Sequence, residues 1–86
     1  MSEYTPIACA LHEHFQYAVI KKLLLDLIWS DEFGARREDR VRPMDVYTKA
    51  QAEYLLVEIE DLGKVEIRLD YIHQARWVTN GNLLGG

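Results

Sequence analysis

Residues 53–70 read EYLLVEIEDLGKVEIRLD, and this stretch decides the fold class. Apolar residues recur at every second position on both sides of a short connection, which is the pattern of strands that bury one face. Gly63 lies in the connection and can adopt the positive φ of a tight turn. The inward positions are Leu55, Val57, Ile59, Val65, Ile67 and Leu69. The stretch therefore predicts a β-hairpin with one buried face.

Segments on either side of this hairpin continue a β pattern. A last strand is expected through ARWV (75–78), and the Gly-rich TNGNLLGG (79–86) is expected to be a flexible tail. Before the hairpin, MDVYTKAQA (44–52) reads as a loop with exposed Lys49 and Gln51. The heavily charged ARREDRVR (35–42) is expected to form a strand that ends at Pro43, because proline cannot donate to a central ladder.

The first strand is expected within KKLLLDLIWS (21–30), where alternation begins at Lys21. The turn residues SDEFG (30–34) follow it and end at Gly34. Its shared face comprises Leu23, Leu25, Leu27 and Trp29.

A helix is predicted after Cys9, because the apolar period changes there to that of a helical stripe. Pro6 favours an extended lead over residues 1–8. His12 and His14 fall on the flanks of the stripe. Its inward residues are Leu11, Phe15, Ala18 and Val19, with Cys9 also expected to face inward, and its outward residues are Glu13, Gln16 and Tyr17. The outward face is either a solvated helix back or a partner contact.

One helix followed by five short antiparallel strands gives a mainly β (α+β) fold. We expect the helix to pack on a strongly curved, barrel-like sheet, since curvature reduces the exposure of sheet edges. The predicted organisation is a single domain over residues 1–78 and a flexible tail over 79–86.

Composition restricts the classes of function. The formal charge of −4 argues against unaided nucleic-acid binding, which requires a basic surface. One cysteine cannot form an internal disulfide, so a reducing cytoplasm is expected. The beginning of the sequence lacks the basic residues of a secretion signal, and no apolar run is long enough for a membrane span.

Four short motifs occur in order along the chain: Y-x-P-I-x-C at 4–9, D-V-x-T at 45–48, E-Y-L at 53–55 and I-R-L-D-x-I at 67–72. Together they resemble the Rof family of Rho-binding antiterminators. The resemblance implies an Sm-like curved sheet with an N-terminal helix. It also implies binding to the N-terminal RNA-binding domain of the termination helicase Rho, which keeps transcript out, with no cofactor and no catalysis. A monomer without direct nucleic-acid contact is expected.

The predicted helix departs from the family in its charge. Family members usually carry several acids there, whereas Glu13 is the only acid between Cys9 and Lys21. Fewer acids should weaken electrostatic steering toward a basic partner. Tyr17 adds an aromatic of the kind enriched in interfaces. The residues expected to contact the partner are Glu13, Gln16, Tyr17, His12, Lys49 and Gln51.

Three other interpretations compete with partner binding. Arg36, Arg37, Arg40 and Arg42 could make an Sm-like RNA-binding strand, although Glu38 and Asp39 interrupt them. The chain could also be a purely structural small subunit. Cys9, His12 and His14 offer zinc donors, but their spacing is not that of a standard structural site, so no metal is expected. No catalytic constellation is recognisable, so no enzymatic activity is expected.

Overall fold

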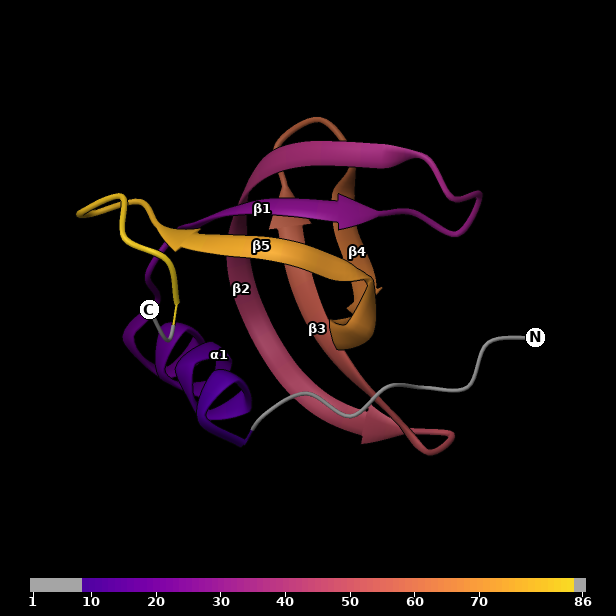
Figure 1. Cartoon of the computed structure of the whole chain (residues 1–86), viewed down its shortest axis with the longest axis horizontal. Helices are drawn as coiled ribbons and strands as arrows, with labels where there is room; N and C mark the ends of the chain where they lie inside the picture. The colour runs from indigo at the N-terminus through magenta and orange to yellow at the C-terminus, as the bar shows by residue number, and fades with distance from the viewer. Residues whose placement is uncertain (1–8, 85–86) are drawn as a thin grey trace.

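The computed structural model of the chain describes the backbone of residues 9–84 and the side chains of residues 12–84 (Figure 1). The expected extended lead at 1–8 and the expected inward orientation of Cys9 and Leu11 therefore lie outside the described parts. The elements are α1 (Cys9–Lys21), β1 (Leu25–Ser30), β2 (Arg36–Lys49), β3 (Ala52–Ile59), β4 (Gly63–Arg68), the 3-10 turn η1 (Leu69–Tyr71) and β5 (Ile72–Trp77).

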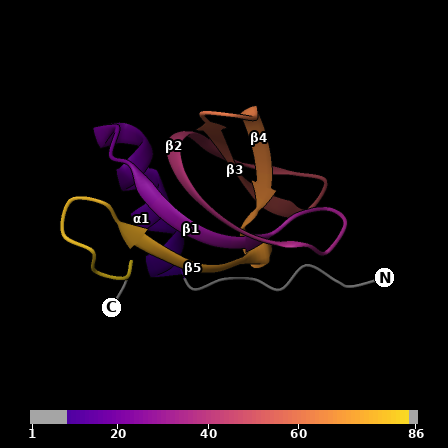
Figure 2. The same ribbon diagram turned by 90° about the horizontal axis from the view of Figure 1, so that it is seen from above.

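The five strands form one antiparallel sheet in the order β4-β3-β2-β1-β5, and α1 lies against it. This confirms the predicted α+β fold of one helix and a five-stranded antiparallel sheet. The sheet curves strongly, as Figures 1 and 2 show, but it is not closed, because the order of paired strands ends at β4 and β5. The arrangement is compatible with the Sm-like fold expected from the sequence.

Strand β2 runs through Pro43, so the predicted strand end at Pro43 and loop at 44–52 are wrong. Residues up to Val41 pair with β1, and residues from Arg42 pair with β3. Pro43 therefore lies just after the point at which β2 changes its pairing partner from β1 to β3. Its missing N–H consequently affects at most one of the two strand pairings. The register shifts between Pro43 and Asp45, which leaves Met44 as the extra residue of a bulge that bends the strand.

The turn between β2 and β3 contains only two residues. Lys49 pairs with Ala52, and the intervening Ala50 and Gln51 both have positive φ, 51° and 64°. Positive φ at both central positions defines a type I′ turn, which suits the twist of a hairpin. The usual Asn-Gly signal is absent from these positions, so this turn was not recognisable from its sequence.

The end of α1 also differs from expectation, since the helix includes Lys21 and β1 begins only at Leu25. Lys22 has φ 57°, the N–H of Leu23 donates to Ala18 O at 3.0 Å, and the N–H of Lys22 donates to Val19 O at 3.3 Å. This pair of bonds is a Schellman motif, which satisfies carbonyls that the helix end would otherwise leave free. The motif uses residues that the alternating pattern assigned to a strand.

The core lies between the inner face of the sheet and α1. Phe15 and Ala18 are fully buried, as predicted for the inward stripe of the helix. The inward strand positions are also confirmed: Leu25, Leu27, Trp29, Leu55, Val57, Ile59, Ile67 and Leu69 are buried, and Val65 is half-buried against them. Leu84, within the segment expected to be a tail, is 8% exposed and belongs to the same core.

Candidate partner interface

The outer face of α1 is open to solvent over the positions predicted from the helical period. Glu13 and Gln16 are exposed, and the side chain of Tyr17 is 50% exposed. Ile20, which the sequence reading did not single out, lies on the same face and is 72% exposed. The outer face of α1 therefore carries exposed apolar surface from Tyr17 and Ile20.

An aromatic cluster continues this face onto the end of β5. The ring of Tyr17 meets Trp77 edge to face with centroids 6.0 Å apart, and the ring of His14 meets it similarly at 6.3 Å. An open cavity of about 480 Å³ adjoins the cluster and is lined by His14, Tyr17, Leu23, Trp77, Thr79 and Asn80. Trp77 was missed from sequence because it reaches α1 only through the folded position of β5.

His12 lies on the opposite flank of α1 and contacts the sheet. Its Nδ1 is buried and lies 3.0 Å from Glu53 Oε1, although the direction of approach is not that of a well-formed hydrogen bond. The contact links α1 to β3. His12, which was predicted to contact a partner, therefore already makes a contact within the protein itself.

Lys49 belongs to a separate cluster on the outer face of β2, β3 and β4. Its Nζ lies 2.8 Å from Glu66 Oε1 and 5.1 Å from the ring centre of Tyr54, while the hydroxyl of Tyr47 donates to Glu66 Oε2. The rings of Tyr47 and Tyr54 stack at 6.1 Å. Gln51, also predicted to contact a partner, is exposed in the adjoining turn.

Hydrogen bonds within this cluster shift the pKa values of its members. The hydrogen bonds from Lys49 and Tyr47 lower the pKa of Glu66, since both stabilise its carboxylate. The hydrogen bond to Glu66 raises the pKa of Tyr47 to about 12, because a tyrosinate there would lose that bond and face a negative charge. Lys49 therefore already forms an ion pair with Glu66.

Carboxylates largely neutralise the arginines of β2. Arg37 Nε lies 3.0 Å from Asp39, Arg40 Nε lies 2.9 Å from Asp26, and Arg42 Nη1 lies 3.6 Å from Glu58. Hydrogen bonds to these partners raise the pKa of Arg37 and of Arg40. Arg36 is exposed at the start of the strand. The strand therefore presents paired charges and offers little free positive charge to phosphates.

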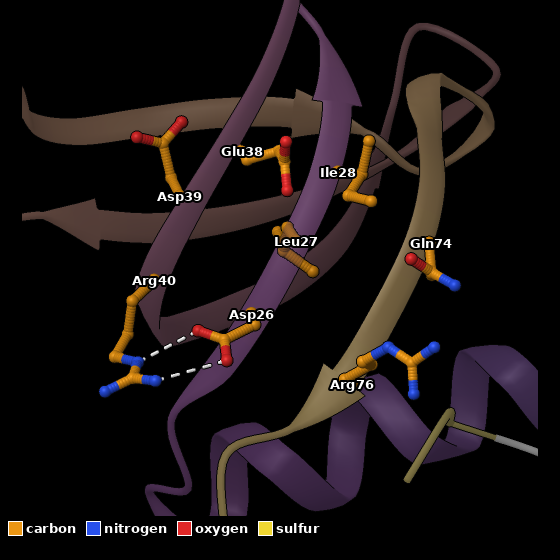
Figure 3. Close-up of a pocket in the computed structure, with 8 residues that line it drawn as sticks. All are labelled: Asp26, Leu27, Ile28, Glu38, Asp39, Arg40, Gln74 and Arg76. Atoms are coloured by element: carbon orange, nitrogen blue, oxygen red, sulfur yellow. Dashed lines mark hydrogen bonds and ion pairs between the residues drawn. The ribbon is translucent and has the colours of Figure 1, made fainter. Parts of the chain in front are cut away.

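A shallow cavity of about 320 Å³ lies on the outer face of β2, β1 and β5 (Figure 3). Arg40 and Asp26 are joined on one side of it, and Gln74 and Arg76 project from β5 on the other. Glu38 and Ile28 lie between them. The side chains have mixed charge, which favours neither an anionic nor a cationic ligand.

A serine and a histidine also meet on the outer surface of the sheet. Ser30 Oγ lies 2.6 Å from His73 Nε2, a pair that the sequence reading did not anticipate. Within residues 12–84, no carboxylate is hydrogen-bonded to His73 to orient it as in a catalytic triad. In the same range no three metal-ligating side chains gather, and no helix is long and apolar enough to span a membrane.

Comparisons with known proteins inform the fold alone. No family model matches the chain, and no curated protein matches it. Among solved structures it is similar to proteasome accessory factor B/C (PafBC) of Arthrobacter aurescens, with a TM-score of 0.69 and 19% sequence identity. The similarity covers 99% of this chain but only 14% of that one. The fold described here therefore occurs as a small part of a much longer protein.

Proposed function

We propose that this protein binds the termination factor Rho at its N-terminal RNA-binding domain and suppresses Rho-dependent termination by keeping RNA out. The proposal combines the four motifs that resemble the Rof family with one structural observation. That observation is the exposed outer face of α1, where Tyr17 and Ile20 are 50% and 72% exposed and Tyr17 lines the cavity beside Trp77.

The chemistry of this face favours a contact driven by shape and apolar area. Glu13 is the only acid of α1, so long-range attraction to a basic RNA-binding surface is limited. A few residues at the centre of an interface, often Trp or Tyr, commonly supply most of its binding energy. We therefore place Tyr17 and Trp77 at its centre, with Glu13 and Gln16 at its rim.

The test is a titration of purified Rho from the same organism with the wild-type protein and with Tyr17→Ala. Loss of a central aromatic should weaken binding about tenfold or more, which corresponds to about 1.4 kcal/mol. Phe33→Ala is the matched control, since Phe33 is 87% exposed in the turn between β1 and β2, away from α1. Circular dichroism would establish that both variants remain folded.

Displacement of labelled RNA from Rho distinguishes occlusion from mere binding. The wild-type protein should release RNA and increase read-through of a Rho-dependent terminator in a purified transcription system. No complex with Rho at low salt would refute the proposal. The alternative of RNA binding by the Arg36–Arg42 strand gains no support from its ion pairs, and direct retention of RNA by the protein alone would be required to revive it.

A further inference from the structure

The segment after β5 folds back along the free edge of that strand, as Figure 1 shows in yellow. The N–H of Trp77 donates to Asn82 O at 2.9 Å, and the N–H of Leu84 donates to Ala75 O at 2.9 Å. Arg76 and Leu83 are partners in an antiparallel bridge between these bonds. Residues 82–84 thus act as a short additional strand on the side of β5 that faces away from β1.

Three further features hold this segment in place. The reversal depends on Gly81, whose φ of 74° is unfavourable for residues with a Cβ, and its N–H donates to Trp77 O at 2.7 Å. The guanidinium of Arg76 donates to Gly81 O at 2.8 Å. Leu84 then inserts into the core at 8% exposure. A flexible tail would have none of these contacts.

The edge that the segment covers is otherwise suited to pairing. The order of the sheet ends at β5, and an end strand presents backbone groups that another chain can extend. Next to the Leu84 side chain, a cavity of about 260 Å³ adjoins the start of β5. It is lined by Phe15, Ile72, His73, Gln74, Ala75, Leu83 and Leu84. Release of the segment would therefore expose both strand edge and apolar surface.

A second copy of the chain carries the matching element. Strand β4 is at the other end of the same sheet and has six residues, as β5 has. Ile67 is buried and Val65 half-buried on its inner face, while Lys64 and Glu66 are exposed on the outer face. Addition of this strand to β5, where Ala75 is buried and Arg76 exposed, would continue one apolar and one charged face.

We propose that residues 79–84 are an edge guard, which occupies the β5 edge and prevents it from pairing with β4 of a second copy. Because this interaction is between copies of the chain, it does not depend on Rho binding. The exposed Lys64 and Glu66 of β4 also disfavour association, and residues 79–84 add a direct cover over the edge of β5.

The test uses the full chain with Gly81→Val, and independently with Leu84→Asp. A Cβ added at Gly81 would meet no heavy atom within 4 Å, so backbone strain from its φ of 74° is the main effect on the reversal. Gly34→Val is a matched control, because Gly34 has a similar φ of 81° and equally open surroundings in a turn away from β5. Both guard variants should sediment as dimers or larger species with increasing concentration, and the control and wild type should stay monomeric.

Hydrogen exchange provides the second measurement. The N–H groups of Trp77 and of residue 84 should exchange faster in the guard variants at dilution, where association is absent. Adding Val65→Lys, an inward charge on β4, to Gly81→Val should restore the monomer. Guard variants that expose these N–H groups yet remain monomeric would overturn the proposal. Continued protection of both N–H groups in both variants would also overturn it, since the segment would not depend on its turn and buried leucine.

Discussion

The indole Nε1 of Trp29 donates a hydrogen bond to Asp39 Oδ2 at 3.0 Å and thereby joins the side chains of β1 and β2. Trp29 is 4% exposed, and the side chain of Asp39 is 12% exposed. Arg37 Nε donates to the same carboxylate oxygen at 3.0 Å. One carboxylate therefore satisfies a buried indole and a neighbouring guanidinium.

Asp39→Ala should destabilise the protein by about 1–3 kcal/mol, the usual cost of leaving a buried donor such as the Trp29 N–H without an acceptor. Urea denaturation followed by tryptophan fluorescence would measure the loss. Asp26→Ala is the matched control, since it removes an Asp–Arg pair whose side chains are 43% and 62% exposed. Exposed pairs contribute little, so equal losses in the two variants would contradict the role given to Trp29.

The hairpin at 53–70 was predictable because its alternation is unbroken and Gly63 marks its turn. The second half of β2 was not, because the bulge at Met44 shifts the alternation by one residue and Pro43 suggests a strand end. The two-residue turn at Ala50 and Gln51 lacks the usual Asn-Gly pair, so the connection from β2 to β3 could not be located from the sequence either. The local sequence pattern does not predict this part of β2, because the strand is held by its pairing with β1 and then with β3 and not by a strong local preference for strand.

The candidate interface was predictable in part for a similar reason. The helical period places Glu13, Gln16 and Tyr17 outward, and the structure agrees with that orientation. Trp77 becomes part of the surface only when β5 pairs with β1 and the chain reverses at Gly81. Tyr17 and Trp77 are 60 positions apart, and a contact over that separation produces no periodic pattern in a single sequence.

Ala50→Asn combined with Gln51→Gly should stabilise the protein by about 1 kcal/mol. Both positions have positive φ, which costs residues with a Cβ about 1–2 kcal/mol each, and Asn-Gly is the preferred pair for a type I′ turn. Thermal denaturation would measure the gain, and a lower melting temperature would show that the turn is not of this type. The same variant tests the predicted role of Gln51, since unchanged affinity for Rho would remove it from the interface.

Tyr47 should titrate with a midpoint near pH 12, as its raised pKa requires. Its folded pKa lies above the ordinary value of about 10, so its contribution to stability is complete below pH 10 and is lost as the pH rises through 12. The difference in tyrosinate absorbance between wild type and Tyr47→Phe would isolate this group. Glu66→Gln should move the midpoint downward, and a wild-type midpoint near 10 would contradict the hydrogen bond.

Excess EDTA should leave the melting temperature unchanged. His12 faces Glu53 at 3.0 Å, whereas His14 packs against Trp77 with ring centres 6.3 Å apart, so the two histidines lie on different flanks of α1 and do not converge on one ion. A structural metal would stabilise the folded state in proportion to the logarithm of its concentration over its dissociation constant, and a chelator would remove that contribution. Added zinc should likewise fail to raise the melting temperature. A large chelator-induced loss of structure would instead require both histidines to leave their present contacts and turn toward Cys9, which would disrupt the first turns of α1.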